Sequence, residues 1–247
     1  MLVPETFALI VVTFLIAGTL KGTVGLGLPL VAIVFMAIPL GFKEAIAIVL
    51  LPGLVTNVWQ ALAGPYFRVL LKRLWPYLVA CILGTWLGVN ILSLASKDTL
   101  LSTLGIILAA YSLFSLMRPQ IAAPGRAEPI LGPLSGGLGG VFYGMTSVFL
   151  VPGVLYLQAL GLKKDEMVQA LGLVFILLNI SMISAFLEKG FISQDVTFLS
   201  IFAILPTVIG IYFGQKLRRH ISEELFRRIF FQLLFVIAIY FFVSAQM

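Results

Sequence analysis

Charged residues are scarce in this 247-residue sequence, and so are cysteine and histidine. Only 11% of the residues are Asp, Glu, Lys or Arg, against about 25% in an ordinary soluble domain. This scarcity excludes a soluble enzyme, a disordered protein and a nucleic-acid-binding protein. The single cysteine, Cys81, excludes a disulfide framework and a cysteine-rich metal site. The single histidine, His220, argues against a histidine-based catalytic or metal centre.

Hydrophobic residues make up 61% of the chain, which is the composition of a membrane protein. A membrane-spanning helix needs about 20 apolar residues. Stretches of ordinary spanning length are residues 44–63, 74–94, 99–117, 167–187, 196–214 and 225–246. No basic residue precedes the first apolar run, so we expect no signal peptide. The sequence predicts an all-α polytopic membrane protein.

Two further apolar stretches, residues 5–40 and 130–160, are too long for one straight helix across a hydrocarbon core of about 30 Å. Both contain clustered glycines followed by proline, which suits the first turn of a new helix. The glycines are Gly18, Gly22, Gly25 and Gly27 before Pro29, and Gly136, Gly137, Gly139, Gly140 and Gly144 before Pro152. Each stretch is predicted to be two short helices joined by a Gly-rich turn. One long tilted helix with glycines for close packing is the alternative.

The second half of the chain repeats the order of features in the first half. The corresponding pairs are Leu28-Pro29 and Val151-Pro152, Asn57 and Asn179, Gly84 and Gly210, and Gly88 and Gly214. The GxxxG spacing of the last two pairs favours close helix packing. We predict one integral membrane domain with a first repeat at 1–117, a linker at 118–129 and a second repeat at 130–247. Internal repeats of this kind are common in secondary transporters.

The basic residues indicate the relative orientation of the two repeats. If each broken stretch crosses the membrane once, the loops on the two sides hold nine and six Lys or Arg residues. If each stretch leaves on the side it entered, the numbers become twelve and three, with Lys43, Lys97 and Lys189 forming the smaller group. The larger group is Arg68, Lys72, Arg73, Arg118, Arg126, Lys163, Lys164, Lys216, Arg218, Arg219, Arg227 and Arg228.

Twelve against three is a strong positive-inside bias, and nine against six is not. We therefore predict two inverted repeats, each a broken or re-entrant Gly-rich helical hairpin plus three transmembrane helices. Both termini are predicted to be extracytoplasmic. Hairpins that cross fully as two short spans give the same parity, so re-entry and full crossing both stay open.

Lys21 is the sharpest candidate for function, because it is the only charge well inside an apolar segment. A buried charge in a membrane is costly and marks a functional site, and an ammonium complements an anion. Its alternative role is to snorkel to a nearby interface. Broken helices add helix ends and glycine backbone that can approach an anion closely. The residues predicted to bind substrate are Lys21, Gly22, Thr23, Gly25, Gly27, Thr56, Asn57, Gln60, Tyr143, Gly144, Thr146, Ser147 and Asn179.

The amides and hydroxyls in this set could replace the hydration shell of an oxyanion, and interhelical hydrogen bonding is their alternative role. No Walker motif and no mid-span Asp or Glu is present. We therefore expect no ATP drive, no cofactor, no metal and no carboxylate proton relay. An anion channel stays open as an alternative to a transporter. An intramembrane lipid-phosphate enzyme is a weaker one, because it needs carboxylates or histidines at the site.

The glycine pattern Gly18-x3-Gly22-x2-Gly25-x-Gly27-x-Pro29, with its second copy ending at Pro152, resembles the sulfite exporter TauE/SafE family, also called the TSUP permeases. The resemblance covers nearly the whole chain. It implies a non-enzymatic permease for sulfite or an organosulfonate in the bacterial cytoplasmic (inner) membrane, with the glycines and prolines of both copies shaping the central site. Two departures are Leu26 within the first glycine run and Thr146-Ser147-Val148 where glycines are usual.

The expected partners are a small anionic substrate and membrane lipids, with no nucleic acid. Thiosulfate-handling relatives use cysteines in the pathway, and Cys81 alone, outside the glycine motifs, argues against that chemistry here. Lipid-facing surfaces are apolar whether or not a chain dimerises, so the sequence leaves a homodimer open. It also leaves open the direction of transport.

Overall fold

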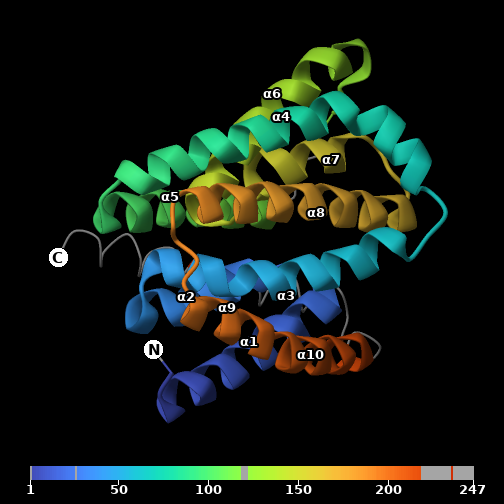
Figure 1. Ribbon diagram of the computed structural model, residues 1–247. Helices are drawn as coiled ribbons and strands as arrows, with labels where there is room; N and C mark the ends of the chain where they lie inside the picture. Colours follow the sequence, from blue (N-terminus) through green and yellow to red (C-terminus); the bar gives the residue numbers. More distant parts are fainter. Residues whose placement is uncertain (1, 26, 118–121, 218–234, 236–247) are drawn as a thin grey trace. The chain divides into compact units, whose positions relative to one another are not determined.

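The computed structural model describes residues 2–25, 27–117, 122–217 and 235, and every regular element in these ranges is helical (Figure 1). The elements are α1 (Pro4–Val24), α2 (Leu28–Leu40), α3 (Phe42–Leu62), α4 (Phe67–Leu94), α5 (Lys97–Met117), η1 (Gly125–Ala127), α6 (Glu128–Thr146), the π-helical turn η2 (Leu150–Val154), α7 (Leu155–Ala159), α8 (Lys164–Glu188), α9 (Gln194–Phe202) and α10 (Ile204–Leu217).

Five of the described helical segments are long and apolar enough to cross a membrane. They are Pro4–Thr23, Phe42–Leu62, Phe67–Leu94, Lys164–Glu188 and Gln194–Leu217. The predicted all-helical membrane architecture is confirmed at this level. The predicted span 225–246, apart from Phe235, lies outside the described residues, as do Arg118, Arg218, Arg219, His220, Arg227 and Arg228.

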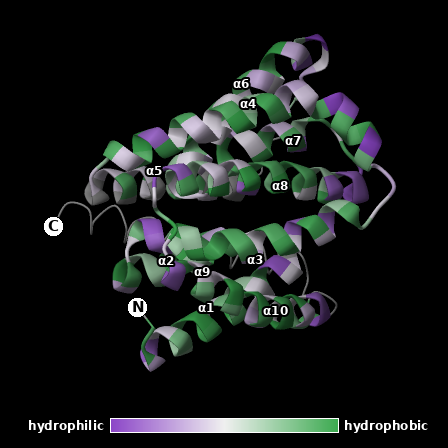
Figure 2. Cartoon of the chain, viewed as in Figure 1, coloured by the Kyte–Doolittle hydropathy of each residue, from purple (hydrophilic) through white to green (hydrophobic). Residues whose placement is uncertain are grey.

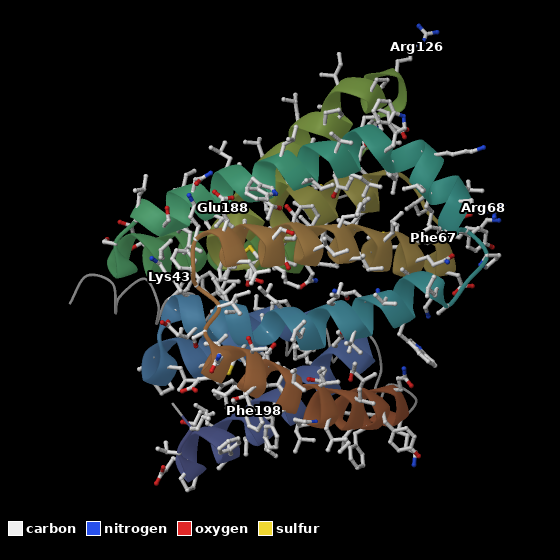
Figure 3. All side chains as sticks on the ribbon, viewed as in Figure 1. Lys43, Phe67, Arg68, Arg126, Glu188 and Phe198 are labelled. Atoms are coloured by element: carbon white, nitrogen blue, oxygen red, sulfur yellow. The ribbon has the colours of Figure 1, made fainter. Side chains whose placement is uncertain are left out.

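Hydrophilic residues gather at helix ends, as Figure 2 shows for the beginnings of α4 and α8. Arg68 extends outward at the beginning of α4, and Arg126 extends outward from η1, just before α6 (Figure 3). Along the helices the surface is apolar instead, with Leu83 and Leu87 of α4 more than half exposed. Apolar sides with charged ends are the pattern that a bilayer selects.

The chain divides into two compact units, each containing segments from both halves of the sequence. Unit 1 comprises Met1–Thr56 and Ile183–Leu225, and unit 2 comprises Asn57–Met182 and Phe226–Met247. The division therefore falls inside α3 and inside α8. Unit 1 holds α1, α2, α9 and α10, and unit 2 holds α4 to α7.

Unit 1 is built around the α1–α10 pair, which lie side by side (Figure 1). Glycines line the contact on both helices. A Cβ on Gly18 would overlap the Thr207 carbonyl, and one on Gly22 would overlap the Ile211 carbonyl. A Cβ on Gly214 would meet the Thr19 carbonyl in return. Backbone approach this close requires small residues on both helices.

Unit 2 is built in the same way around the α4–α6 pair. A Cβ on Gly140 would overlap the Cys81 carbonyl, and one on Gly144 would overlap the Thr85 carbonyl. A Cβ on Gly88 would meet the Val141 carbonyl. The predicted packing role of the GxxxG residues in α4 and α10 is confirmed by these contacts.

The two helix pairs match residue by residue. Adding 122 to residue numbers in α1 gives α6, and subtracting 126 from those in α10 gives α4. Gly18 against Thr207 then becomes Gly140 against Cys81, and each of the other glycine contacts has its counterpart too. The first helix of each half thus packs against a later helix of the other half.

The second helix break does not lie where the glycine cluster suggested. All five glycines from Gly136 to Gly144 lie inside the continuous helix α6, most of them against α4. The chain leaves the helix only at Ser147, which has a left-handed φ of 58°. Each apolar stretch was predicted to contain two short helices. The first helix of each stretch is not short, because α1 has 21 residues and α6 has 19. Close packing explains the glycines.

Buried side chains satisfy backbone groups that the helices leave open. In unit 1, Pro52 has no N–H for the Ile48 carbonyl, and the buried Ser200 hydroxyl donates to that carbonyl at 2.8 Å. In unit 2, the buried Gln169 side chain donates to the Ala61 and Gly64 carbonyls at 2.7 and 2.6 Å. Its oxygen accepts from the Tyr66 N–H at 2.8 Å. Such bonds matter most in a membrane, where no water replaces them.

Candidate functional site

The first helix break runs from Gly25 to Gly27, between α1 and α2. Gly25 ends α1 with φ 90°, and its N–H donates to the Lys21 carbonyl at 2.7 Å. Gly27 precedes α2 with φ 99° and supplies no side-chain cap to that helix. Positive φ values of this kind suit glycine. A Cβ on Gly25 would have no atom within 4 Å, so backbone conformation, and not crowding, selects glycine there.

Lys21 lies in the last turn of α1, one turn before this break, and its side chain is only 7% exposed. Its ammonium donates to the Thr56 hydroxyl, with Nζ and Oγ1 2.8 Å apart. The Thr56 hydroxyl lies 2.8 Å from the Pro52 carbonyl and 3.0 Å from the Gly53 carbonyl, to which it can donate. When the Thr56 hydroxyl donates to one of these carbonyls, its oxygen can still accept the hydrogen bond from the Lys21 ammonium. Because the hydroxyl is neutral, it positions the Lys21 charge without cancelling it.

Two other predicted residues of this break contact α10. Gly22 lies against the Ile211 backbone. The Thr23 hydroxyl lies 2.7 Å from the Thr19 carbonyl and 3.2 Å from the Gly214 carbonyl of α10. Both residues fix the end of α1 on α10, which holds Lys21 at the break.

The second helix break, Ser147 to Phe149, has the same backbone turn. The Ser147 N–H donates to the Tyr143 carbonyl at 2.6 Å, as Gly25 does to Lys21. Tyr143 therefore occupies the position of Lys21 and Ser147 that of Gly25. The Thr146 hydroxyl accepts from the Val148 N–H at 3.2 Å and lies 2.7 Å from the Phe142 carbonyl, so it caps the turn.

Aromatic rings surround the second break. The Tyr143 ring lies 6.3 Å from both the Phe149 and the Phe175 ring, and those two are 5.9 Å apart. Tyr77 of α4 also contacts Phe149 and donates its hydroxyl to the Gly153 carbonyl at 3.0 Å. Sequence reasoning did not identify Phe149, Phe175 or Tyr77, because nothing in their spacing separates them from ordinary apolar residues of a membrane helix.

The remaining predicted residues lie in unit 2. Gly144 packs on α4. Gln60 donates to the Val168 carbonyl at 2.9 Å and so joins α3 to α8. Asn179 is buried and donates to the Phe175 carbonyl at 2.7 Å, and Asn57 is buried as well. The structure thus brings Lys21 together with Thr56 in unit 1, and Tyr143 with Thr146 and Ser147 in unit 2.

No metal-binding group of His, Cys, Asp and Glu side chains occurs in the described ranges. An ion pair lies in unit 2, where the Arg73 guanidinium binds Glu128 in a bidentate manner at 2.9 and 3.0 Å. This guanidinium holds the pKa of the Glu128 carboxyl below its usual range. Lys21 brings a positive charge to the first helix break.

In the comparison with protein families, residues 10–241 match the family model described as sulfite exporter TauE/SafE. The chain belongs to the sulfite exporter TauE/SafE family. The resemblance inferred from the glycine pattern is confirmed, and it extends through both halves. No curated protein and no solved structure has significant similarity to the chain.

Membership of the TauE/SafE family makes the chain a multi-pass membrane transporter of the sulfur-anion class. This agrees with the apolar helices and with a small anionic substrate. It is a family of transporters and not of enzymes.

Proposed function

We propose that this TauE/SafE protein is a secondary transporter that moves sulfite or an organosulfonate across the bacterial cytoplasmic membrane by alternating access. Lys21 is the residue that binds the anion. The supporting observation is a buried ammonium, one turn before a helix break, held by a neutral hydroxyl. A charge kept at such a cost in an apolar helix has a functional use.

The elements around Lys21 favour an anion. The N-terminus of α2 carries a partial positive charge and N–H groups that its cap residue Gly27 leaves without a side-chain acceptor. Together with the ammonium, these groups complement an oxyanion. Gly25 adds backbone without a side chain at the same turn, so a ligand can approach closely.

We further propose that the two halves are inverted repeats with both termini outside the cytoplasm. The reciprocal glycine contacts of α1 with α10 and of α6 with α4 support duplication. The twelve-to-three distribution of basic residues supports inversion. A reporter fused after Met247 that is active only in the cytoplasm would contradict this orientation.

The function is tested by the uptake of radiolabelled sulfite into proteoliposomes. Lys21→Met keeps the side-chain length and removes the charge, and we expect the transport rate at low sulfite to fall about 10- to 150-fold, as for loss of a hydrogen bond to a charged group. Lys21→Arg keeps the charge and should retain part of the rate. The matched control is Lys72→Met, which removes an exposed lysine on α4.

An unchanged rate in Lys21→Met would contradict the role of this residue. Absence of flux for sulfite, taurine and sulfoacetate in the wild-type protein would contradict the substrate class. Flux without saturation and without counterflow would identify a channel in place of a carrier.

A further inference from the structure

The second helix break contains two buried hydroxyl groups that lack hydrogen-bond partners. Tyr143 is 0% exposed and Ser147 is 1% exposed, and neither hydroxyl has a partner among the described residues. Ser147 ends α6 and Tyr143 lies one turn before it, so both hydroxyls belong to the same end of this helix. Buried polar groups in native proteins are nearly always paired, so two orphaned groups at one helix end need an explanation, and a bound ligand supplies one.

Two other buried hydroxyls, those of Thr13 and Ser112, also lack partners. Each belongs to a continuous helix, α1 or α5, and neither is a residue of a break or of the helix turn that precedes one. The pair at Tyr143 and Ser147 differs because both hydroxyls lie at one interruption of the helix, and Ser147 has the left-handed φ.

We propose that Tyr143 and Ser147 form a second anion site, separate from Lys21, which binds the oxygen atoms of sulfite or an organosulfonate through neutral hydroxyl donors. Tyr143 occupies in the second half the position that Lys21 occupies in the first, and each position lies in its own compact unit. The proposal thus gives each unit a binding site of its own for one class of substrate. The inference rests on the proposed function.

The surroundings of the pair suit a weakly hydrated oxyanion. The Tyr143 ring packs against Phe149 and Phe175 and is fully buried, and burial strengthens each hydrogen bond that a ligand makes there. Thr146 is occupied in capping the turn, so it does not compete for the anion. With hydroxyl donors and no ammonium, this site should bind the anion more weakly than the Lys21 site.

The test is calorimetric titration of the purified, full-length protein with sulfite and, separately, with methanesulfonate. We expect two sites per chain in the wild type. Lys21→Met should retain the weaker site. Tyr143→Phe and Ser147→Gly should each retain the tighter site and weaken the other at least tenfold. Ser147→Gly removes the hydroxyl and still allows the left-handed turn. Ser112→Ala, which removes an orphaned hydroxyl elsewhere, should change neither site.

Thermal unfolding without anion gives an independent readout. Removing an unpaired buried hydroxyl should leave the melting temperature of Tyr143→Phe equal to or above that of the wild type. A lower melting temperature with unchanged anion affinity would mean that the hydroxyl binds only a structural water, and the proposal would be overturned. One wild-type site that Lys21→Met abolishes would overturn the second site and leave the transport function intact. No binding of either anion to the wild type would contradict both.

Discussion

The two helix breaks share one backbone geometry and differ in their chemistry. In both, a left-handed residue closes the helix by donating its N–H to the carbonyl four residues earlier. At the first break the accepting carbonyl belongs to a lysine, Lys21, and the left-handed residue is a glycine, Gly25. At the second break the accepting carbonyl belongs to Tyr143 and the left-handed residue is Ser147, and aromatic rings pack around Tyr143. Repeated backbone can thus carry a charged site in one unit and a neutral site in the other.

The largest effect is expected where the backbones meet. Gly18→Ala in α1 and Gly140→Ala in α6 each place a methyl group on a backbone carbonyl of the partner helix. Since backbone cannot rotate aside, each should lower the free energy of unfolding by about 1–3 kcal/mol. Thermal unfolding in detergent measures this, and Gly137→Ala, where a Cβ has 4.0 Å of space, is the control. Strongly unequal losses would contradict the equivalence of the two helix pairs.

Exchange of the left-handed residues should give a smaller effect, opposite in sign at the two breaks. A non-glycine residue in this conformation costs about 1–2 kcal/mol. Gly25→Ser should therefore lower the melting temperature, although there is space for its Cβ, and Ser147→Gly should raise it. Differential scanning of both variants without substrate checks this. A stabilised Gly25→Ser would show that the first break does not need its left-handed turn.

The smallest effect on stability is expected from the carboxylates in the first turns of α6 and α1, Glu128 and Glu5. Because Arg73 lowers the pKa of Glu128 from its usual 4.5, the ion pair contributes stability above that value. The contribution is lost as the pH falls through the lower pKa of the folded protein. Both side chains are partly exposed, so the effect should stay below about 1 kcal/mol. Glu128→Gln should reduce the fall of the melting temperature as the pH is lowered below 4.5. Glu5→Gln, in the first turn of α1, is the control.

The sequence predicted the helical membrane fold, most of the spans and the family, because apolar stretches and the glycine pattern are visible without tertiary information. It also located the first break, where positive φ requires Gly25 and Gly27 and where Pro29 begins the next helix. The second break was misplaced because glycines that allow close packing look the same as glycines that allow a turn. Ser147, the residue that makes the turn, has no distinctive type.

Tertiary hydrogen bonds were beyond the sequence as well. Gln169 appeared to be an ordinary polar residue near the start of a span, yet it joins three backbone groups around the α3–α4 connection. The Lys21–Thr56 contact joins residues 35 positions apart. Lys21 and Thr56 were both predicted to belong to the site, but only the folded structure shows that their side chains are in contact.

Pro52 links Lys21 to α9 of unit 1 through a series of hydrogen bonds. The Thr56 hydroxyl lies on the Pro52 carbonyl, and the Ser200 hydroxyl replaces the hydrogen bond that the proline removes from α3. Proline is the usual place for a helix to bend. A bend of α3 at this point would move Thr56 away from the Lys21 ammonium. The curvature of α3 and the hydrogen bonding of Lys21 are therefore linked through one proline.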